Sequence, residues 1–210
     1  MVKSCAMKRN VPTIGLMGGI GSGKSLIAEF LETLGCVVAN ADENASQVWK
    51  QQEVLDTIVS WWGDSVLLTD GSVNRSHVAK IVFQDVNERV RLESLLHPRI
   101  RALQENQFEN ANGDVVAYVI DAPLLMEAGL DTHCDALIFV DASPEIRHKR
   151  CSQTRNWDPK ELERREAAQI PLDKKRDSAD YVLCNEDTQS EAMNELRQIL
   201  ESILHKFNTD

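Results

Sequence analysis

Glycine, lysine and serine recur in one short stretch of this 210-residue sequence, Gly18-Gly-Ile-Gly-Ser-Gly-Lys-Ser25, which fits the pattern G-x-x-x-x-G-K-[ST]. Glycines let a backbone fold tightly enough for several N–H groups to point at one anion, and a lysine adds a full positive charge. The expected ligand is a nucleoside triphosphate held by its β- and γ-phosphates, with the Ser25 hydroxyl on Mg²⁺. We expect the nucleotide to contact a continuous run of residues: Gly19, Ile20, Gly21, Ser22, Gly23, Lys24, Ser25 and Leu26.

Two aspartates follow apolar runs that are typical of strands. Asp42 comes shortly after Val37-Val-Ala, and Asp121 closes the run Val115-Val-Ala-Tyr-Val-Ile. Transfer of a phosphoryl group to an alcohol needs a carboxylate that orients the hydroxyl and takes its proton, and Asp42 could be that base. Asp42 could equally cap a helix that begins at Glu43. Asp121 has the position of an acid that supports Mg²⁺, although aspartates are also common in turns.

A basic cluster stands out in the second half of the chain. Arginine forks match phosphate geometry, so a mobile segment that carries them could close over a transferring group. The alternative is that Glu161, Glu163 and Glu166 pair with these residues along a solvated helix. We expect Arg155 and Arg165 to be functional and the rest to be surface residues, the whole cluster being Arg147, Lys149, Arg150, Arg155, Arg164 and Arg165.

Short apolar runs alternate with helical patterns along the chain, which predicts parallel strands joined by crossover helices. The expected fold is α/β, a doubly wound parallel sheet with strands at Thr13–Met17, Cys36–Ala39, Val115–Ile120, Ala136–Val140 and Tyr181–Cys184. Ligands of such sheets bind at the carboxyl ends of the strands. The glycine-rich loop, Asp42, Asp121 and Asp141 all follow strands on that edge.

The spacing of the strands is uneven. The long interval between the second and third strands carries helical patterns, and we expect a helical insertion over about 53–110 that binds the acceptor. A second excursion, dense in charge, would form a lid over about 146–176. We therefore expect a flexible tail over residues 1–10 and one domain over 11–210.

The composition is that of a globular chain, with 42% apolar and 27% charged residues. Its net charge of −10 argues against nucleic acid or an anionic membrane as the main partner. The five cysteines are scattered without a C-x-x-C pair, so neither a disulfide framework nor a zinc site is expected, and those in or beside strands are expected to be buried. With no apolar stretch typical of a signal peptide or a membrane span, we expect a cytoplasmic location.

Several further blocks resemble the dephospho-coenzyme A kinase family over about Thr13 to Asn185. They are I-G-L-M-G-G-I-G-S-G-K-S, N-A-D-x-x-A at Asn40–Ala45, L-L-H-P-R-I at Leu95–Ile100, V-I-D-A-P-L-L-M-E at Val119–Glu127 and the run from Arg164 to Val182 that contains A-A-Q-I-P-L-D-K-K. The glycine-rich loop alone would be generic, whereas the later blocks are far more specific to this family.

The resemblance implies a P-loop NTPase core and ATP-dependent phosphorylation of the ribose 3′-hydroxyl of dephospho-coenzyme A. It implies Asp42 as the catalytic base, Arg155 and Arg165 on the phosphates, and Asn185 near the adenine. The loop pattern itself puts Lys24 on the phosphates and Ser25 on Mg²⁺, and the strand-end position of Asp121 puts it near the same ion. The family usually has an acid where this chain has Asn40, which removes one negative charge.

Two other functions fit the glycine-rich loop. One is another small-molecule P-loop kinase, acting on a nucleoside or other alcohol. Such a kinase would use the same loop and would differ only in its acceptor pocket. The other is a nucleotide-dependent switch, against which the absence of an N-K-x-D segment counts.

Overall fold

The computed structural model describes residues 10–111, 113–186 and 188–209. Of the expected N-terminal tail, residues 1–9 lie outside this description. The chain divides into two compact units, which are described separately. The helical unit comprises residues 40–110, and the sheet unit comprises the chain before and after it.

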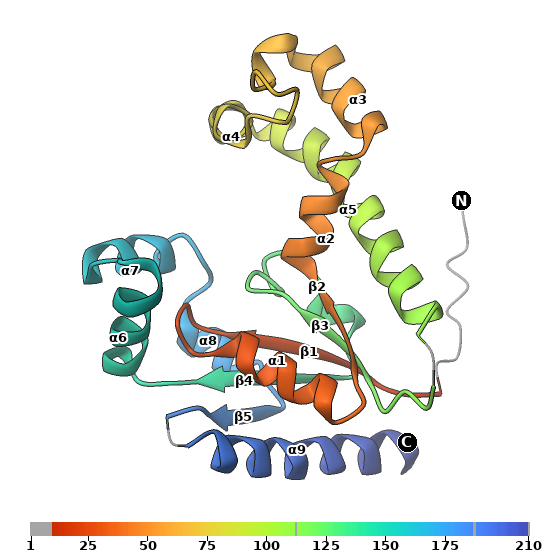
Figure 1. Cartoon of the computed structure of the whole chain (residues 1–210), viewed down its shortest axis with the longest axis vertical. Coiled ribbons are helices and arrows are strands. Elements are labelled where there is room, and N and C mark those ends of the chain that lie inside the picture. The colour runs from red at the N-terminus through yellow and green to blue at the C-terminus, as the bar shows by residue number, and fades with distance from the viewer. Residues whose placement is uncertain (1–9, 112, 187, 210) are drawn as a thin grey trace. The chain divides into compact units, whose positions relative to one another are not determined.

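The sheet unit is built on five strands in the order β2-β3-β1-β4-β5 (Figure 1). β1 pairs in parallel with β3 on one side and β4 on the other, and β5 pairs in parallel with β4. The predicted α/β class and five-stranded parallel sheet are therefore confirmed. The strands are β1 (Thr13–Gly18), β2 (Val37–Asn40), β3 (Tyr118–Asp121), β4 (Ala136–Asp141) and β5 (Tyr181–Cys184).

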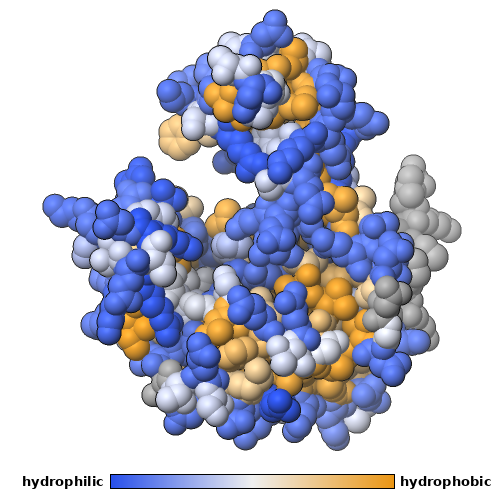
Figure 2. Space-filling model, in the orientation of Figure 1, coloured by the Kyte–Doolittle hydropathy of each residue, from blue (hydrophilic) through white to orange (hydrophobic). Residues whose placement is uncertain are grey.

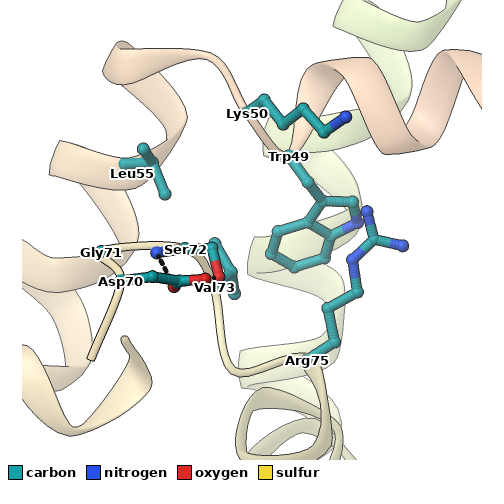
Figure 3. Close-up of a pocket in the computed structure, with 8 residues that line it drawn as sticks. All are labelled: Trp49, Lys50, Leu55, Asp70, Gly71, Ser72, Val73 and Arg75. Atoms are coloured by element: carbon teal, nitrogen blue, oxygen red, sulfur yellow. Dashed lines mark hydrogen bonds between the residues drawn. The ribbon is translucent and has the colours of Figure 1, made fainter. Parts of the chain in front are cut away.

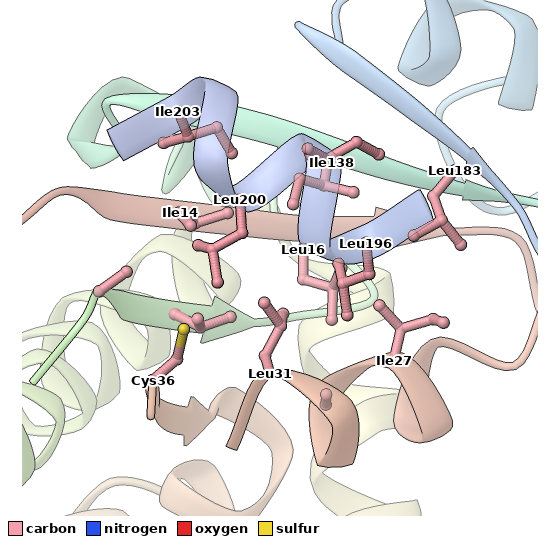
Figure 4. Close-up of a cluster of buried hydrophobic side chains, with 14 of the residues drawn as sticks. Ile14, Leu16, Ile27, Leu31, Cys36, Ile138, Leu183, Leu196, Leu200 and Ile203 are labelled. Carbon is pink, nitrogen blue, oxygen red and sulfur yellow. The ribbon is translucent and has the colours of Figure 1, made fainter. Parts of the chain in front are cut away.

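The core of this unit lies between the sheet and two helices, α1 (Lys24–Thr33) and α9 (Gln189–Thr209) (Figure 4). Each fully buried leucine or isoleucine contributes roughly 1.5–3 kcal/mol to the free energy of folding relative to an exposed one. This cluster therefore fixes the strands whose ends carry the loops. Its members include Ile14, Leu16, Ile27, Leu31, Ile138, Leu183, Leu196, Leu200 and Ile203.

Three further helices connect β4 to β5: α6 (Pro144–Arg155), α7 (Pro159–Glu166) and α8 (Leu172–Asp177). Proline is the first residue of both α6 and α7, where its missing N–H costs no hydrogen bond. Asp158 caps α7, since its side chain accepts from the Glu161 N–H at 2.8 Å. The segment expected to be a lid thus consists of three short helices.

The helical unit contains α2 (Ala41–Val48), α3 (Gln52–Trp62), α4 (Arg75–Gln84) and α5 (Val86–Glu109), with a short 3₁₀ helix at Asp64–Val66. It has its own apolar core, in which α2 and α4 both contact α5. The fully buried members of this core include Val48, Val54, Ile58 and Val66. In the described parts of the chain, no helix combines the length and the apolar character needed to cross a membrane.

The expectation that the cysteines in or beside strands are buried is confirmed for Cys36 but not for the whole set. Cys134, beside β4, is half-buried, and Cys184 is exposed although it belongs to a strand. β5 is an edge strand of the sheet, so its last residue lacks the cover that neighbouring strands give to inner strands.

Candidate active site

The glycine-rich loop joins the end of β1 to the start of α1. Gly21 and Gly23 have φ values of 80° and 88°, which non-glycine residues rarely adopt. A Cβ on Gly21 would lie 2.8 Å from both the Arg147 carbonyl oxygen and the Cys151 sulfur. The loop therefore packs directly on α6, and its path requires glycine for both reasons.

Lys24, the first residue of α1, forms an ion pair with Asp121 at the end of β3. The Lys24 side chain is 13% exposed and that of Asp121 is 3% exposed. β1 and β3 are adjacent, and the register pairs Leu16 with Asp121, so the sheet itself places this carboxylate beside the loop. Lys24 and Asp121, which were predicted as site residues from separate motifs, are thus in direct contact.

Two arginines on α6 hold the backbone of the loop. Arg147 is 7% exposed, donates to the Ile20 carbonyl oxygen at 3.3 Å and pairs with Glu166. Arg150 donates to the carbonyl oxygens of Ser22, at 2.9 Å, and Asn185, at 2.8 Å. We had expected Arg147 and Arg150 to be surface residues, and that prediction is wrong. Their i,i+3 spacing on one helix face, with Cys151 beside them, was the available signal.

Asn185 follows β5 and is 3% exposed. Its side-chain amide donates to the Ser22 carbonyl oxygen at 2.7 Å, and its backbone N–H donates to the Asp141 carbonyl oxygen at 2.8 Å. The side chain therefore supports the loop from within the protein. Contact of Asn185 with an adenine ring stays a prediction.

Arg155 and Arg165 both contact the ring of Trp157, a residue for which no function was predicted from the sequence. Their Cζ atoms lie 4.9 and 4.1 Å from the centroid of the Trp157 ring. Arg165 also donates from Nε to Glu161 at 2.7 Å. Hydrogen bonds from Arg164 and Arg165 lower the pKa of the Glu161 carboxyl to about 2. The alternative, in which glutamates pair with this basic cluster, therefore holds in part. Glu161 pairs with both Arg164 and Arg165, and Glu166 pairs with Arg147.

Asp42 lies in the first turn of α2, in the helical unit, and is exposed. The helix begins at Ala41, and its cap is Asn40, whose side-chain oxygen accepts from the N–H groups of Asp42 and Glu43 at 3.0 and 3.1 Å. The alternative in which Asp42 caps a helix beginning at Glu43 is wrong. The Asp42 carboxylate is not needed for capping, because Asn40 already satisfies these donors.

A cavity of about 430 Å³ opens within the helical unit (Figure 3). Arg75 lies against the Trp49 ring, with its Cζ 5.6 Å from the ring centroid. Leu55 and Val73 add apolar surface, and Lys50 adds a second positive charge. The complete lining is Trp49, Lys50, Leu55, Asp70, Gly71, Ser72, Val73 and Arg75. Its volume is in the range of small-molecule sites, and its lining carries two cationic side chains and one carboxylate, that of Asp70.

Mg²⁺ at a nucleotide site keeps several waters and takes only one or two protein ligands besides the phosphates. Among the described residues, no group of three or more His, Cys, Asp or Glu side chains could hold a metal by itself. Ser25 is exposed in the first turn of α1, and Asp121 lies beside Lys24. One hydroxyl and one nearby carboxylate fit a metal that is bound mainly through a nucleotide.

The chain matches known proteins over most of its length. A family model described as dephospho-CoA kinase matches residues 12–191. A dephospho-CoA kinase of Rhodopirellula baltica is 37% identical over 200 residues, which cover 93% of this chain and 90% of that protein. One of Syntrophotalea carbinolica is 38% identical over 174 residues, which cover 82% of each.

Solved structures agree on the fold. The crystal structure of TT1252 from Thermus thermophilus superposes with a TM-score of 0.78 at 27% identity, covering 94% of this chain and 98% of that one. A dephospho-CoA kinase from Campylobacter jejuni gives a TM-score of 0.54 at 21% identity, covering 91% and 97%. The chain therefore belongs to the dephospho-CoA kinase family, a family of kinases that use ATP.

Proposed function

We propose that this protein transfers the γ-phosphoryl group of ATP to the ribose 3′-hydroxyl of dephospho-coenzyme A, giving coenzyme A and ADP. The observation that carries the proposal is the loop Gly18–Lys24, held by Arg147, Arg150 and Asn185, in a chain that belongs to this family. Such a loop serves phosphoryl transfer because the reaction depends on positioning and on charge stabilisation far more than on covalent chemistry.

The nucleotide would be bound by the loop from residue 19 to 26. Backbone N–H groups from Gly21 to Lys24 would donate to the β- and γ-oxygens, and the N-terminus of α1 would add its partial positive charge. Lys24 already lies at the loop with Asp121 as its counter-ion. Its ammonium group would bind the same phosphate oxygens when the triphosphate enters.

Ser25 and Asp121 would hold Mg²⁺, Ser25 by direct ligation and Asp121 directly or through water. The ion would neutralise charge on the β- and γ-phosphate oxygens. Asp121 can serve both Lys24 and a metal-bound water because a carboxylate has two oxygens with several acceptor positions.

Asp42 would orient the 3′-hydroxyl and accept its proton. Its carboxylate is exposed and free of capping duty, as this role requires. The helical unit would bind the rest of the acceptor, with its cavity around Trp49 and Arg75 as the candidate contact for an anionic and partly apolar molecule. Helices α6 to α8 would form the lid, from which Arg155 and Arg165 engage the phosphates.

The test is release of ADP from Mg-ATP in the presence of a panel of acceptors: dephospho-coenzyme A, adenosine, shikimate and gluconate. We expect fast release with dephospho-coenzyme A alone. Fast release with another alcohol would assign a different acceptor to the same site, and slow release that no acceptor stimulates would indicate a nucleotide-dependent switch.

A further inference from the structure

Trp157 lies between α6 and α7, where Asn156 ends the first helix in a left-handed conformation (φ 54°) and Asp158 caps the second. The ring is half-buried, and it is approached by one arginine from each helix. Arg155 is the last residue of α6 and Arg165 lies in the last turn of α7. One indole thus brings together two cations that are ten positions apart in the sequence.

The ring is the main restraint on Arg155. Within residues 10–111, 113–186 and 188–209, no ion pair or side-chain hydrogen bond is found for the Arg155 guanidinium, and its recorded contact is the Trp157 ring at 4.9 Å. An exposed arginine without such a contact samples many rotamers and loses that freedom whenever it binds a ligand. Contact with the ring removes part of this cost before the ligand arrives.

A cation that lies over an aromatic ring keeps its hydrogen-bond donors. The ring attracts the charge through its negative face, while the N–H groups of a stacked guanidinium point outward in the plane of the fork. In the part of the chain that the structure describes, Arg165 donates to Glu161 through Nε alone, which leaves its terminal nitrogens for another anion. Both arginines can therefore stay near Trp157 and bind phosphate oxygens at the same time.

The surface around them gives little other support. Hydrophilic residues predominate on the visible face of α6 and α7, with some white and orange residues among them (Figure 2). Trp157 is the single Phe, Tyr or Trp residue between Pro144 and Asp177. Two guanidinium groups close to one ring also repel each other, and Glu161 compensates only the charge of Arg165. A polyphosphate bound at Arg155 would relieve the remaining repulsion, which favours anion binding at this point.

We propose that Trp157 is a positioning residue that holds Arg155 and Arg165 in place for the phosphates of the nucleotide. This inference rests on the proposed function, since it concerns the same phosphoryl transfer. Trp157 itself needs no contact with the substrate, because it acts through the two arginines.

The test compares Trp157→Leu, which removes the aromatic face, with Trp157→Phe, which retains one. We expect kcat/KM for ATP to fall about tenfold in Trp157→Leu and to stay within about threefold of the parent in Trp157→Phe, from the usual strength of two cation–π contacts. The KM for dephospho-coenzyme A should not change. Arg164→Ala is the matched control, because Arg164 pairs with Glu161 and makes no cation–π contact with the ring among the described residues. It should retain the parent value.

A double-mutant cycle separates positioning from general stability. If Trp157 acts through Arg155, Trp157→Leu should have a clearly smaller effect in an Arg155→Ala background than in the parent. Equal effects in both backgrounds, or an unchanged kcat/KM in Trp157→Leu, would overturn the proposal.

Tryptophan fluorescence provides a readout that does not need the acceptor. It also does not depend on whether the Trp157→Leu variant folds. Addition of ATP, or of inorganic triphosphate, should change the tryptophan emission of the parent, and Trp157→Phe should lose most of that change. An equal change in Trp157→Phe would contradict the proposal. A parent protein that shows the fluorescence change but makes no coenzyme A would refute the proposed function and leave the role of Trp157 standing.

Discussion

The side-chain amide of Asn185 donates to the carbonyl oxygen of Ser22 at 2.7 Å, linking the end of β5 to the middle of the glycine-rich loop. Because Asn185 is 3% exposed, this bond forms where water cannot replace it. Arg150 donates to the same carbonyl oxygen and also to the Asn185 carbonyl oxygen, so Asn185 and Arg150 together support the loop at Ser22.

Replacing Asn185 with alanine should loosen this support. We expect the free energy of unfolding to fall by about 1–3 kcal/mol, since a buried hydrogen bond is lost, and the KM for ATP to rise several-fold. Thermal unfolding and steady-state kinetics measure the two effects. Asn194→Ala, at an exposed position of α9, is the matched control. If both variants behave alike, Asn185 does not support the loop.

Gly21→Ala should damage the loop more than backbone strain alone would. Gly21 and Gly129 both have positive φ values, but only Gly21 has atoms within 4 Å of the position that a Cβ would take. We expect Gly129→Ala to cost about 1 kcal/mol of stability and to leave kcat/KM intact. In Gly21→Ala the displaced loop should lower kcat/KM by about 100-fold. Equal kinetic effects would mean that packing on α6 does not position the loop.

Lys175 and Glu127 give the sheet unit a pH-dependent contact between α8 and the segment that follows β3. Lys175 is 1% exposed and lies 2.7 Å from Glu127, which also accepts from the Ile170 N–H at 2.9 Å. Burial alone would raise the pKa of Glu127, but the hydrogen bonds from Lys175 and Ile170 outweigh it and lower the pKa below its ordinary 4.5.

A lowered pKa means that the folded state favours the ionised carboxylate. Its stabilisation is therefore complete above pH 4.5 and is lost as the pH falls through the lowered value. We expect Glu127→Gln to unfold about 2 kcal/mol more easily at pH 7, with the difference from the parent shrinking in acid. Urea unfolding between pH 7 and pH 3 measures this gap, and a gap that is constant with pH would refute the ion-pair explanation.

Much of the fold follows from the sequence because burial leaves a regular pattern. The strand Tyr181–Cys184 is predicted at its observed bounds, and the interval between the second and third strands is helical as expected. The third strand was expected from Val115 but begins at Tyr118. The N–H of Val116 donates to the Gly35 carbonyl oxygen, outside the named strands. An apolar side chain such as that of Val116 therefore predicts burial, but it does not show that the residue belongs to a strand.

The supports of the loop could not be predicted with equal success, because they depend on how α6 lies against it. The i,i+3 spacing of Arg147 and Arg150 beside Cys151 is the one local signal, and it does not by itself show that this face of α6 lies against the loop. The same holds for the α2 cap, where Asn40 and Asp42 are both good capping residues. Only the observed start of the helix at Ala41 decides between them.

Asp42→Asn tests the proposed base. We expect kcat to fall at least about 100-fold, because the hydroxyl loses its proton acceptor, while the KM for ATP stays near the parent value. Glu43→Gln, the neighbouring acid in the same exposed turn, should remain fully active. A fully active Asp42→Asn protein would remove Asp42 from the mechanism.

The most direct measurement is mass spectrometry of dephospho-coenzyme A after incubation with Mg-ATP and the purified protein, with Lys24→Ala in parallel. We expect the parent to add one phosphoryl group and yield coenzyme A, and Lys24→Ala to form product at least about 100-fold more slowly. Unmodified dephospho-coenzyme A in the parent reaction, or equal product from Lys24→Ala, would contradict phosphoryl transfer at this loop.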